Sequence, residues 1–148
     1  MRLHTPADLL HHVGETMGES DWHEITQHQV DTFADATHDH QWIHTDPARA
    51  EAGPFGGTIA HGYLTLALAP LFLAETVSID ELTAGINYGL NKVRFPAPVP
   101  VGSRLRARVD LVEAKVRPTG VEATFGITVE VPGSARPACV AEAVVVYS

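Results

Sequence analysis

The chain has 148 residues, 45% of them hydrophobic, which suffices for one core, and we expect a single domain over residues 1–148. The formal net charge of −8 at pH 7 argues against a nucleic-acid-binding protein, because neutralising phosphates requires a basic face. No apolar run reaches the roughly 18 residues of a transmembrane helix, and the first residues lack the order of a signal peptide, so we expect a cytoplasmic protein without a membrane partner. The only cysteine, Cys139, lies in an apolar run that is typical of a buried, unreactive thiol.

The first half of the chain carries the signals of short helices. Thr5-Pro6 predicts one that starts there and that Gly14 could end. Thr26, followed three residues later by Gln29, forms a capping-box pattern and predicts the start of a second helix. Asp46-Pro47 predicts a third short helix, which ends before the glycine-rich loop that follows.

A longer helix is predicted from His61 to about Val77, where nearly every side chain is apolar. A helix of this composition is buried on most of its sides, and about 16 residues are too few to span a bilayer comfortably. Pro70 should kink this helix or end its first segment, because proline lacks the backbone N–H that a helix needs.

The second half of the chain predicts strands. From Val121 to Val131 apolar and polar residues alternate, which is the pattern of a strand with one face in water. From Arg104 to Arg117 the polar residues change from even to odd positions. A strand can change face in this way only by accommodating an extra residue, so we expect a β-bulge near Leu111-Val112.

The remaining strand patterns complete an α+β domain. Ala138 to Tyr147 carries a single charge and predicts a central strand covered on both faces. Ala84 to Phe95 predicts a further long strand, and Trp22 to Ile25 a short one. Helices first and strands afterwards, with one mostly apolar helix, predict an antiparallel sheet wrapped around a buried helix.

The densest group of titratable side chains lies in the polar segment from His38 to Asp46, and all nine histidines precede residue 62. Within it, Asp39 and His44 are separated by aromatic and aliphatic residues that can exclude water. A carboxylate and an imidazole that share one water can accept its proton and return a proton elsewhere, as the hydration of an activated double bond requires. Aspartates before helices also serve simply as caps, and spacing alone leaves that alternative open.

The same segment could instead hold a metal ion, since His38, Asp39, His40 and His44 are all of ligating type. Their spacing does not match the common structural zinc patterns, and no cysteine is near them. We therefore expect no metal at this site.

The segment Gly57–Gly62 leads directly into the predicted buried helix. Backbone N–H groups at a helix N-terminus are unpaired and can bind an oxyanion, and Gly62 permits a substrate carbonyl to approach the backbone closely. Such a donor would stabilise the charge that gathers on a thioester oxygen during addition of water. His61 is either a structural histidine or a group beside the substrate.

The basic residues are concentrated in one segment. Seven of the ten lysines and arginines fall between positions 92 and 117, which keeps an anionic small-molecule ligand plausible despite the acidic total. Lys92 and Arg94 share one face of their strand by parity and could contact phosphates. The alternative, that they are only solvent-facing, stays open at this point.

Three segments resemble, in the same order, those of the MaoC-like dehydratases, or R-specific enoyl-CoA hydratases: Asp39–His44, Gly53–Gly62 and Lys92–Gly102. The resemblance runs over nearly the whole chain. It implies a hot-dog fold, in which an antiparallel sheet wraps a long helix, and a homodimer whose two sheets join edge to edge.

The resemblance also implies a reaction, the reversible hydration of a trans-2-enoyl-CoA to the (R)-3-hydroxyacyl product. Asp39 and His44 would together activate the water for syn addition, and Gly62 would supply its backbone N–H to the thioester oxygen. No metal or redox cofactor is implied, and coenzyme A enters as part of the substrate.

One position departs from the family pattern. Some members carry a serine in the central helix that bonds the catalytic aspartate, whereas this chain has Pro70 there. Asn87, a polar residue within an apolar strand, is a candidate to orient Asp39 or to contact the substrate. Two alternatives remain: an acyl-CoA thioesterase, since the fold also hosts that reaction, and an acyl-CoA-binding dimer without turnover.

Overall fold

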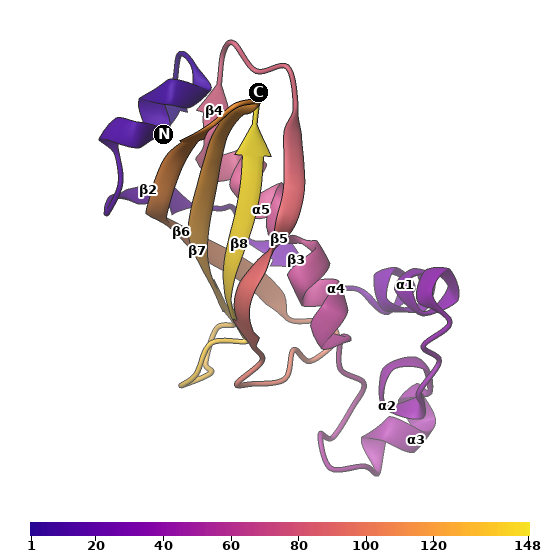
Figure 1. Ribbon diagram of the computed structural model, residues 1–148. Coiled ribbons are helices and arrows are strands. Elements are labelled where there is room, and N and C mark those ends of the chain that lie inside the picture. Colours follow the sequence, from indigo (N-terminus) through magenta and orange to yellow (C-terminus); the bar gives the residue numbers. More distant parts are fainter.

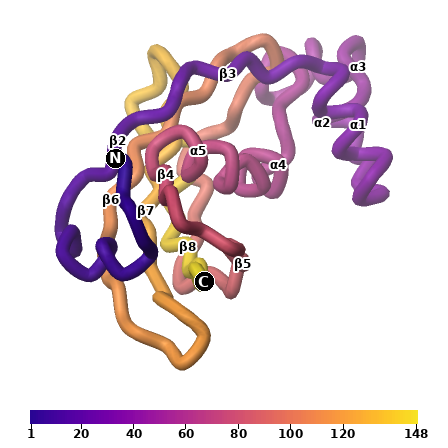
Figure 2. The backbone as a smooth tube through the Cα atoms, turned by 90° about the horizontal axis from the view of Figure 1, so that it is seen from above, coloured from indigo at the N-terminus to yellow at the C-terminus, as the bar shows by residue number.

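The computed structural model describes residues 1–148 and consists of a curved antiparallel sheet with helices on its concave side (Figures 1 and 2). The strand order is β2-β6-β7-β8-β5, and β3 pairs with the start of β6. These strands are β2 (Thr16–Glu19), β3 (His23–Glu24), β5 (Gly85–Arg94), β6 (Arg104–Arg117), β7 (Gly120–Glu130) and β8 (Cys139–Tyr147). A short parallel pair is formed by β1 (Arg2–Leu3) and β4 (Ser78–Ile79).

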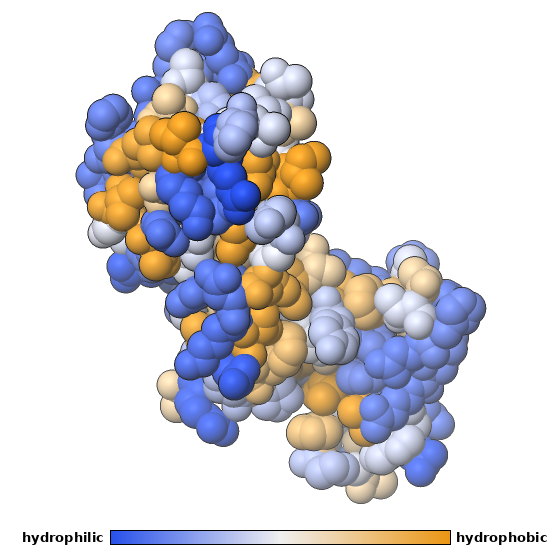
Figure 3. Space-filling view, in the orientation of Figure 1, coloured by the Kyte–Doolittle hydropathy of each residue, from blue (hydrophilic) through white to orange (hydrophobic).

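The helices divide into two groups. A 3₁₀ helix (Pro6–His11), α4 (Gly62–Ala67) and α5 (Ala69–Thr76) pack with the sheet. The others, α1 (Gln27–Thr37), α2 (Trp42–Thr45) and α3 (Pro47–Glu51), extend beyond the sheet as a separate projection (Figures 1 and 3). None of the helices is long and apolar enough to cross a membrane.

The core lies between the concave face of the sheet and α5. Phe72 of α5 and Phe125 of β7 are fully buried there. Burying a side chain of this size contributes roughly 1.5–3 kcal/mol of hydrophobic free energy. The apolar alternation of β7 therefore supplies one wall of the core, and the expectation of an antiparallel sheet around a buried helix, the hot-dog arrangement, is confirmed.

Pro70 interrupts the predicted 61–77 helix, as expected. The segment forms two helices, α4 and α5. Leu68 is the C-cap of α4 and the N-cap of α5. Proline is tolerated in the first turn of a helix because the N–H groups there lack intrahelical partners. The predicted β-bulge is also confirmed, since the pairing of β6 with β7 shifts between Leu111 and Glu113.

The outer face of the sheet differs from the prediction in β8 and at two positions of β7, Glu122 and Thr124, which are both buried. β8 lies inside the sheet, between β7 and β5, but Val140 is 41% exposed, so this strand is not covered on both faces. Glu122 lies on the predicted wet face of β7 yet is buried, because Lys115 and Arg117 cover its carboxylate. The hydrogen bond from Lys115, followed by the one from Arg117, lowers the pKa of Glu122 against the effect of burial.

Candidate active site

His44 is held at both its main chain and its ring. Its Nδ1–H donates to the carbonyl of Ile59 over 2.7 Å, and its own carbonyl accepts from Nε2 of Gln27 over 2.7 Å. The residue is buried, with 7% of its surface exposed. Because Nδ1 is the donor, the lone pair of the neutral ring is on Nε2, which is the acceptor that a water could use.

Asp39 is positioned by the turn that ends α1. His38 closes that helix in the left-handed conformation, with φ of 62°, and it is the only non-glycine residue of the chain with a positive φ. The Asp39 side chain stays 49% exposed. Asp39, His44 and His61 each place one side-chain oxygen or nitrogen atom within 4.8 Å of those of the other two. A single water molecule that makes two hydrogen bonds of about 2.8 Å can bridge such a distance.

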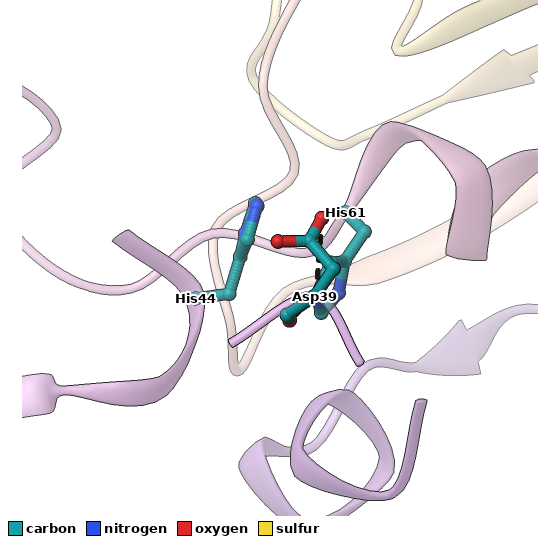
Figure 4. Close-up of side chains that lie close together, drawn as sticks. All are labelled: Asp39, His44 and His61. Atoms are coloured by element: carbon teal, nitrogen blue, oxygen red, sulfur yellow. Dashed lines mark hydrogen bonds and ion pairs between the residues drawn. The ribbon is translucent and has the colours of Figure 1, made fainter. Parts of the chain in front are cut away.

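His61 lies behind this pair and contacts both members (Figure 4). Its Nε2–H donates to the backbone carbonyl of Asp39 over 3.0 Å, and its ring stacks on that of His44 with centroids 3.9 Å apart. Only 2% of its surface is exposed, and Nδ1 has no hydrogen-bond partner. The structure therefore places His61 as packing and hydrogen-bonding support beneath the carboxylate and imidazole.

The electrostatics keep His44 neutral. Burial is the largest effect and lowers its pKa from 6.5, the nearby His61 lowers it further, and the Ile59 carbonyl and the Asp39 carboxylate act in the opposite direction. A neutral imidazole at physiological pH is the form that can accept a proton.

The three side chains fit a metal ion poorly, although their ligand atoms are close together. The planes of His44 and His61 are inclined by only 25°. An imidazole lone pair lies in the plane of its ring, and the planes of two stacked rings do not meet within bonding distance of one ion. The geometry favours a shared water over a metal.

A cavity of about 340 Å³ opens beside His44. Its wall includes Gly62, the first residue of α4, whose N–H has no intrahelical partner. A Cβ built on Gly62 would lie 3.1 Å from the Phe95 ring, so a side chain there would crowd the cavity wall. The other lining residues are mostly apolar: Phe55, Ile59, Ala60, Thr65, Phe95, Pro96, Ala97, Pro98, Val99 and Ala138.

The remaining predicted residues lie elsewhere on the same chain. Lys92 and Arg94 line a surface cavity of about 360 Å³ against β8. Asn87 makes no hydrogen bond to Asp39 and instead lines a second cavity, of about 400 Å³, between α4, α5 and β5. Pro70 and Leu73 line that cavity too, so its lining is mainly apolar.

Two residues near His44 carried no signal in the sequence. Gln27 follows the Thr26 cap and reads as an exposed helix residue, and Thr58 reads as part of a glycine-rich loop. The structure joins them, because the Thr58 hydroxyl donates to Oε1 of Gln27 over 2.6 Å. A periodic pattern reports only on neighbouring residues of one element, so it cannot reveal the contact between Gln27 and Thr58, which are 31 positions apart.

The chain is similar to known proteins over nearly its whole length. Residues 8–131 match the model of the MaoC like domain. The chain is 60% identical over 142 residues to the 3-hydroxyacyl-thioester dehydratase Z of Mycobacterium tuberculosis, covering 95% of this chain and 94% of the relative.

Two solved structures have the same fold. The (R)-hydratase from A. caviae involved in PHA biosynthesis is 26% identical, with a TM-score of 0.74 over 92% of this chain and 96% of that one. The unliganded R-hydratase PhaJ1 from Pseudomonas aeruginosa is 24% identical, with a TM-score of 0.78 over 97% and 84% of the two chains.

Proposed function

This chain belongs to the MaoC-like domain family and is a lyase of the hydratase and dehydratase type, and we propose that it hydrates trans-2-enoyl-CoA reversibly to (R)-3-hydroxyacyl-CoA. The observation that carries the proposal is the proximity of the Asp39 carboxylate to a neutral His44 imidazole beside a mostly apolar cavity. The M. tuberculosis relative is named for 3-hydroxyacyl thioesters, which are the products of such a hydration.

In the proposed reaction, Nε2 of His44 removes a proton from water while the water oxygen bonds to the β-carbon of the substrate. The Asp39 carboxylate accepts a hydrogen bond from the same water and orients it. The electron pair of the double bond moves toward the thioester carbonyl, whose oxygen accepts a hydrogen bond from the Gly62 N–H. The imidazolium then returns the proton to the α-carbon on the same face, so addition is syn and His44 is neutral again.

No step of this scheme needs a metal or a redox cofactor. A cytoplasmic location belongs to the same proposal. The single cysteine is buried and unpaired, and burial raises the pKa of its thiol to about 11, which is compatible with a reducing compartment.

The carrier of the acyl group is coenzyme A in this proposal, and the distribution of cations supports it. Four of the five cations of β6 are paired with carboxylates, and the fifth, Arg104, lies over the Trp22 ring. The four are Arg106, Arg108, Lys115 and Arg117. Lys92 and Arg94 have no carboxylate within ion-pair distance, and both border the β5 end that leads to Phe95 and the first cavity. Two free cations suit the phosphates of coenzyme A.

A homodimer completes the proposal. β5 is an edge strand of ten residues, and every residue of it except Val93 is exposed. Among them Ile86, Tyr88 and Leu90 expose 59%, 62% and 47% of their surfaces. A long, apolar edge strand invites pairing with another strand, and a second copy of this chain offers an identical edge.

The test is the reaction of the purified protein with crotonyl-CoA. The near-ultraviolet absorbance of the conjugated thioester measures hydration of the double bond, and a thiol reagent measures release of free coenzyme A. The proposal predicts loss of the absorbance without release of thiol, and an (R)-3-hydroxybutyryl product. Release of thiol would identify a thioesterase instead, and binding without either signal would identify a non-catalytic acyl-CoA-binding protein. The same assay with crotonyl-pantetheine, which lacks the nucleotide of coenzyme A, shows how much that nucleotide contributes to kcat/KM.

A further inference from the structure

Gln27, the first residue of α1, uses its side-chain amide to join three segments of the chain. Its Nε2 donates to the carbonyl of His44 over 2.7 Å and to the carboxylate of Asp31 over 2.9 Å. Its Oε1 accepts from the Thr58 hydroxyl over 2.6 Å. Two acceptors on one side and a hydroxyl on the other fix which way the amide faces.

These bonds close a ring around His44. Thr58 precedes Ile59, whose carbonyl accepts the Nδ1–H of His44 over 2.7 Å. The N–H of Ile59 in turn donates to the carbonyl of Ile43 over 3.0 Å. The main chain and the ring of His44 are therefore both bound to groups that Gln27 ties together.

We propose that Gln27 is a positioning residue for the hydration, acting through His44 and through the loop that carries the Ile59 carbonyl. By fixing the Ile59 carbonyl against the ring, it keeps His44 in the tautomer with Nδ1 protonated and Nε2 free to take the proton of water. Small displacements of a catalytic group cost rate, since the reacting atoms must stay in a narrow range of distances. The inference rests on the proposed function.

The position of Gln27 separates this role from substrate binding. Gln27 lines neither the cavity beside His44 nor the one between α4, α5 and β5. Its loss should therefore lower kcat and leave KM nearly unchanged.

The variants are Gln27→Met, which keeps the length of the side chain without its hydrogen bonds, Thr58→Val, and the two combined. Each single variant should lower kcat for crotonyl-CoA by about tenfold or more. The double variant should lose no more than the worse single one, because both changes break the same ring.

Thr26→Ala is the matched control for stability. Thr26 caps the same helix, accepting the N–H of Gln29 over 3.1 Å, and it takes no part in the ring around His44. Its loss should lower the melting temperature by roughly 2–4 °C and leave kcat at the wild-type value. A kcat for Gln27→Met equal to that of Thr26→Ala would show that Gln27 only stabilises α1.

A second readout needs no turnover. Nitrogen-15 NMR of the histidine rings should show the Nδ1–H tautomer of His44 in the wild type and a growing share of the Nε2–H tautomer in Gln27→Met and Thr58→Val. If the wild type hydrates crotonyl-CoA and Gln27→Met changes neither kcat nor the tautomer, the inference is wrong and the proposed function stands. If the tautomer changes but the wild type hydrates no enoyl thioester, the positioning of His44 is supported and the proposed function fails.

Discussion

The imidazole rings of His44 and His61 stack with their centroids 3.9 Å apart and their planes inclined by 25°. His61 thereby supports the face of the proposed base and, through its bond to the Asp39 carbonyl, the backbone of its acidic partner. A positive charge on His61 would repel one on His44 at this distance, and His61 accordingly contributes to lowering the pKa of His44.

The pH dependence of the reaction follows from this environment. Burial lowers the pKa of His44 from 6.5, and neutral His44 is the form that accepts the proton of water. We expect the acid limb of kcat/KM, measured over about pH 5 to pH 8, to have its midpoint below pH 6.5. An acid limb with its midpoint above 6.5 would contradict the assignment of His44 as the base.

The same shift affects stability, with the sign set by proton uptake. Below pH 6.5 the unfolded chain takes up a proton on His44 more readily than the folded chain does. The contribution of His44 is therefore complete at higher pH and is lost as the pH falls from 6.5 toward the lower folded pKa. Thermal unfolding of the wild type and of His44→Gln at both ends of this range measures it.

Gly62→Ala tests the proposed oxyanion donor. The new Cβ would lie 3.1 Å from the Phe95 ring, at the wall of the cavity beside His44. We expect kcat/KM to fall by about a hundredfold, because a carbonyl can no longer approach the N–H closely. Gly57→Ala is the control, since a Cβ there meets nothing within 4 Å and the backbone needs no left-handed conformation. Equal losses in the two variants would argue against a role for the Gly62 N–H.

Lys92 and Arg94 provide a test of the carrier. Changing both to glutamine should raise KM for crotonyl-CoA severalfold, roughly 0.5–1 kcal/mol per exposed cation lost, and leave crotonyl-pantetheine unaffected. Arg2→Gln, at the far end of the chain and paired with Asp80, should change neither value. An unchanged KM for crotonyl-CoA in the double variant would remove the phosphate role from both residues.

The β5 edge is tested by Leu90→Asp with Val13→Asp as its control, because each of the two side chains is 47% exposed. A charge on an apolar pairing edge disfavours association. Sedimentation velocity should show Leu90→Asp shifted from dimer to monomer and Val13→Asp unchanged. A wild-type protein that sediments as a monomer at all concentrations would contradict the proposed dimer.

The elements with regular alternation were predictable from the sequence, and so was the bulge. In β6 the polar residues move from even to odd positions because the strand accommodates one extra residue between Leu111 and Glu113. This change can be seen in the sequence alone. Asp39 and His44 were also predictable, because both lie in one short polar segment. Local patterns thus located the four long strands and singled out Asp39 and His44, whose proposed catalytic roles came from the resemblance to the family.

Features that depend on distant contacts were not predictable in the same way. Glu122 alternates like a solvent-facing residue, and only the pairing of β6 with β7 brings Lys115 and Arg117 over it. The short strand β2 has too few residues for a period to appear. The burial of His61 beneath Asp39 likewise requires the fold, since 22 positions separate the two residues.

The most direct test of the central claim, that Asp39 and His44 share one water, is a double-mutant cycle on kcat/KM for crotonyl-CoA. Asp39→Asn keeps the shape of its side chain, and His44→Gln keeps a polar side chain without the imidazole base. Each should lower kcat/KM by about a hundredfold or more. When two groups act on the same water, removing either one abolishes their joint effect. The double variant should therefore be no slower than the slower single variant. Losses that multiply, or a single variant with wild-type activity, would contradict the shared water.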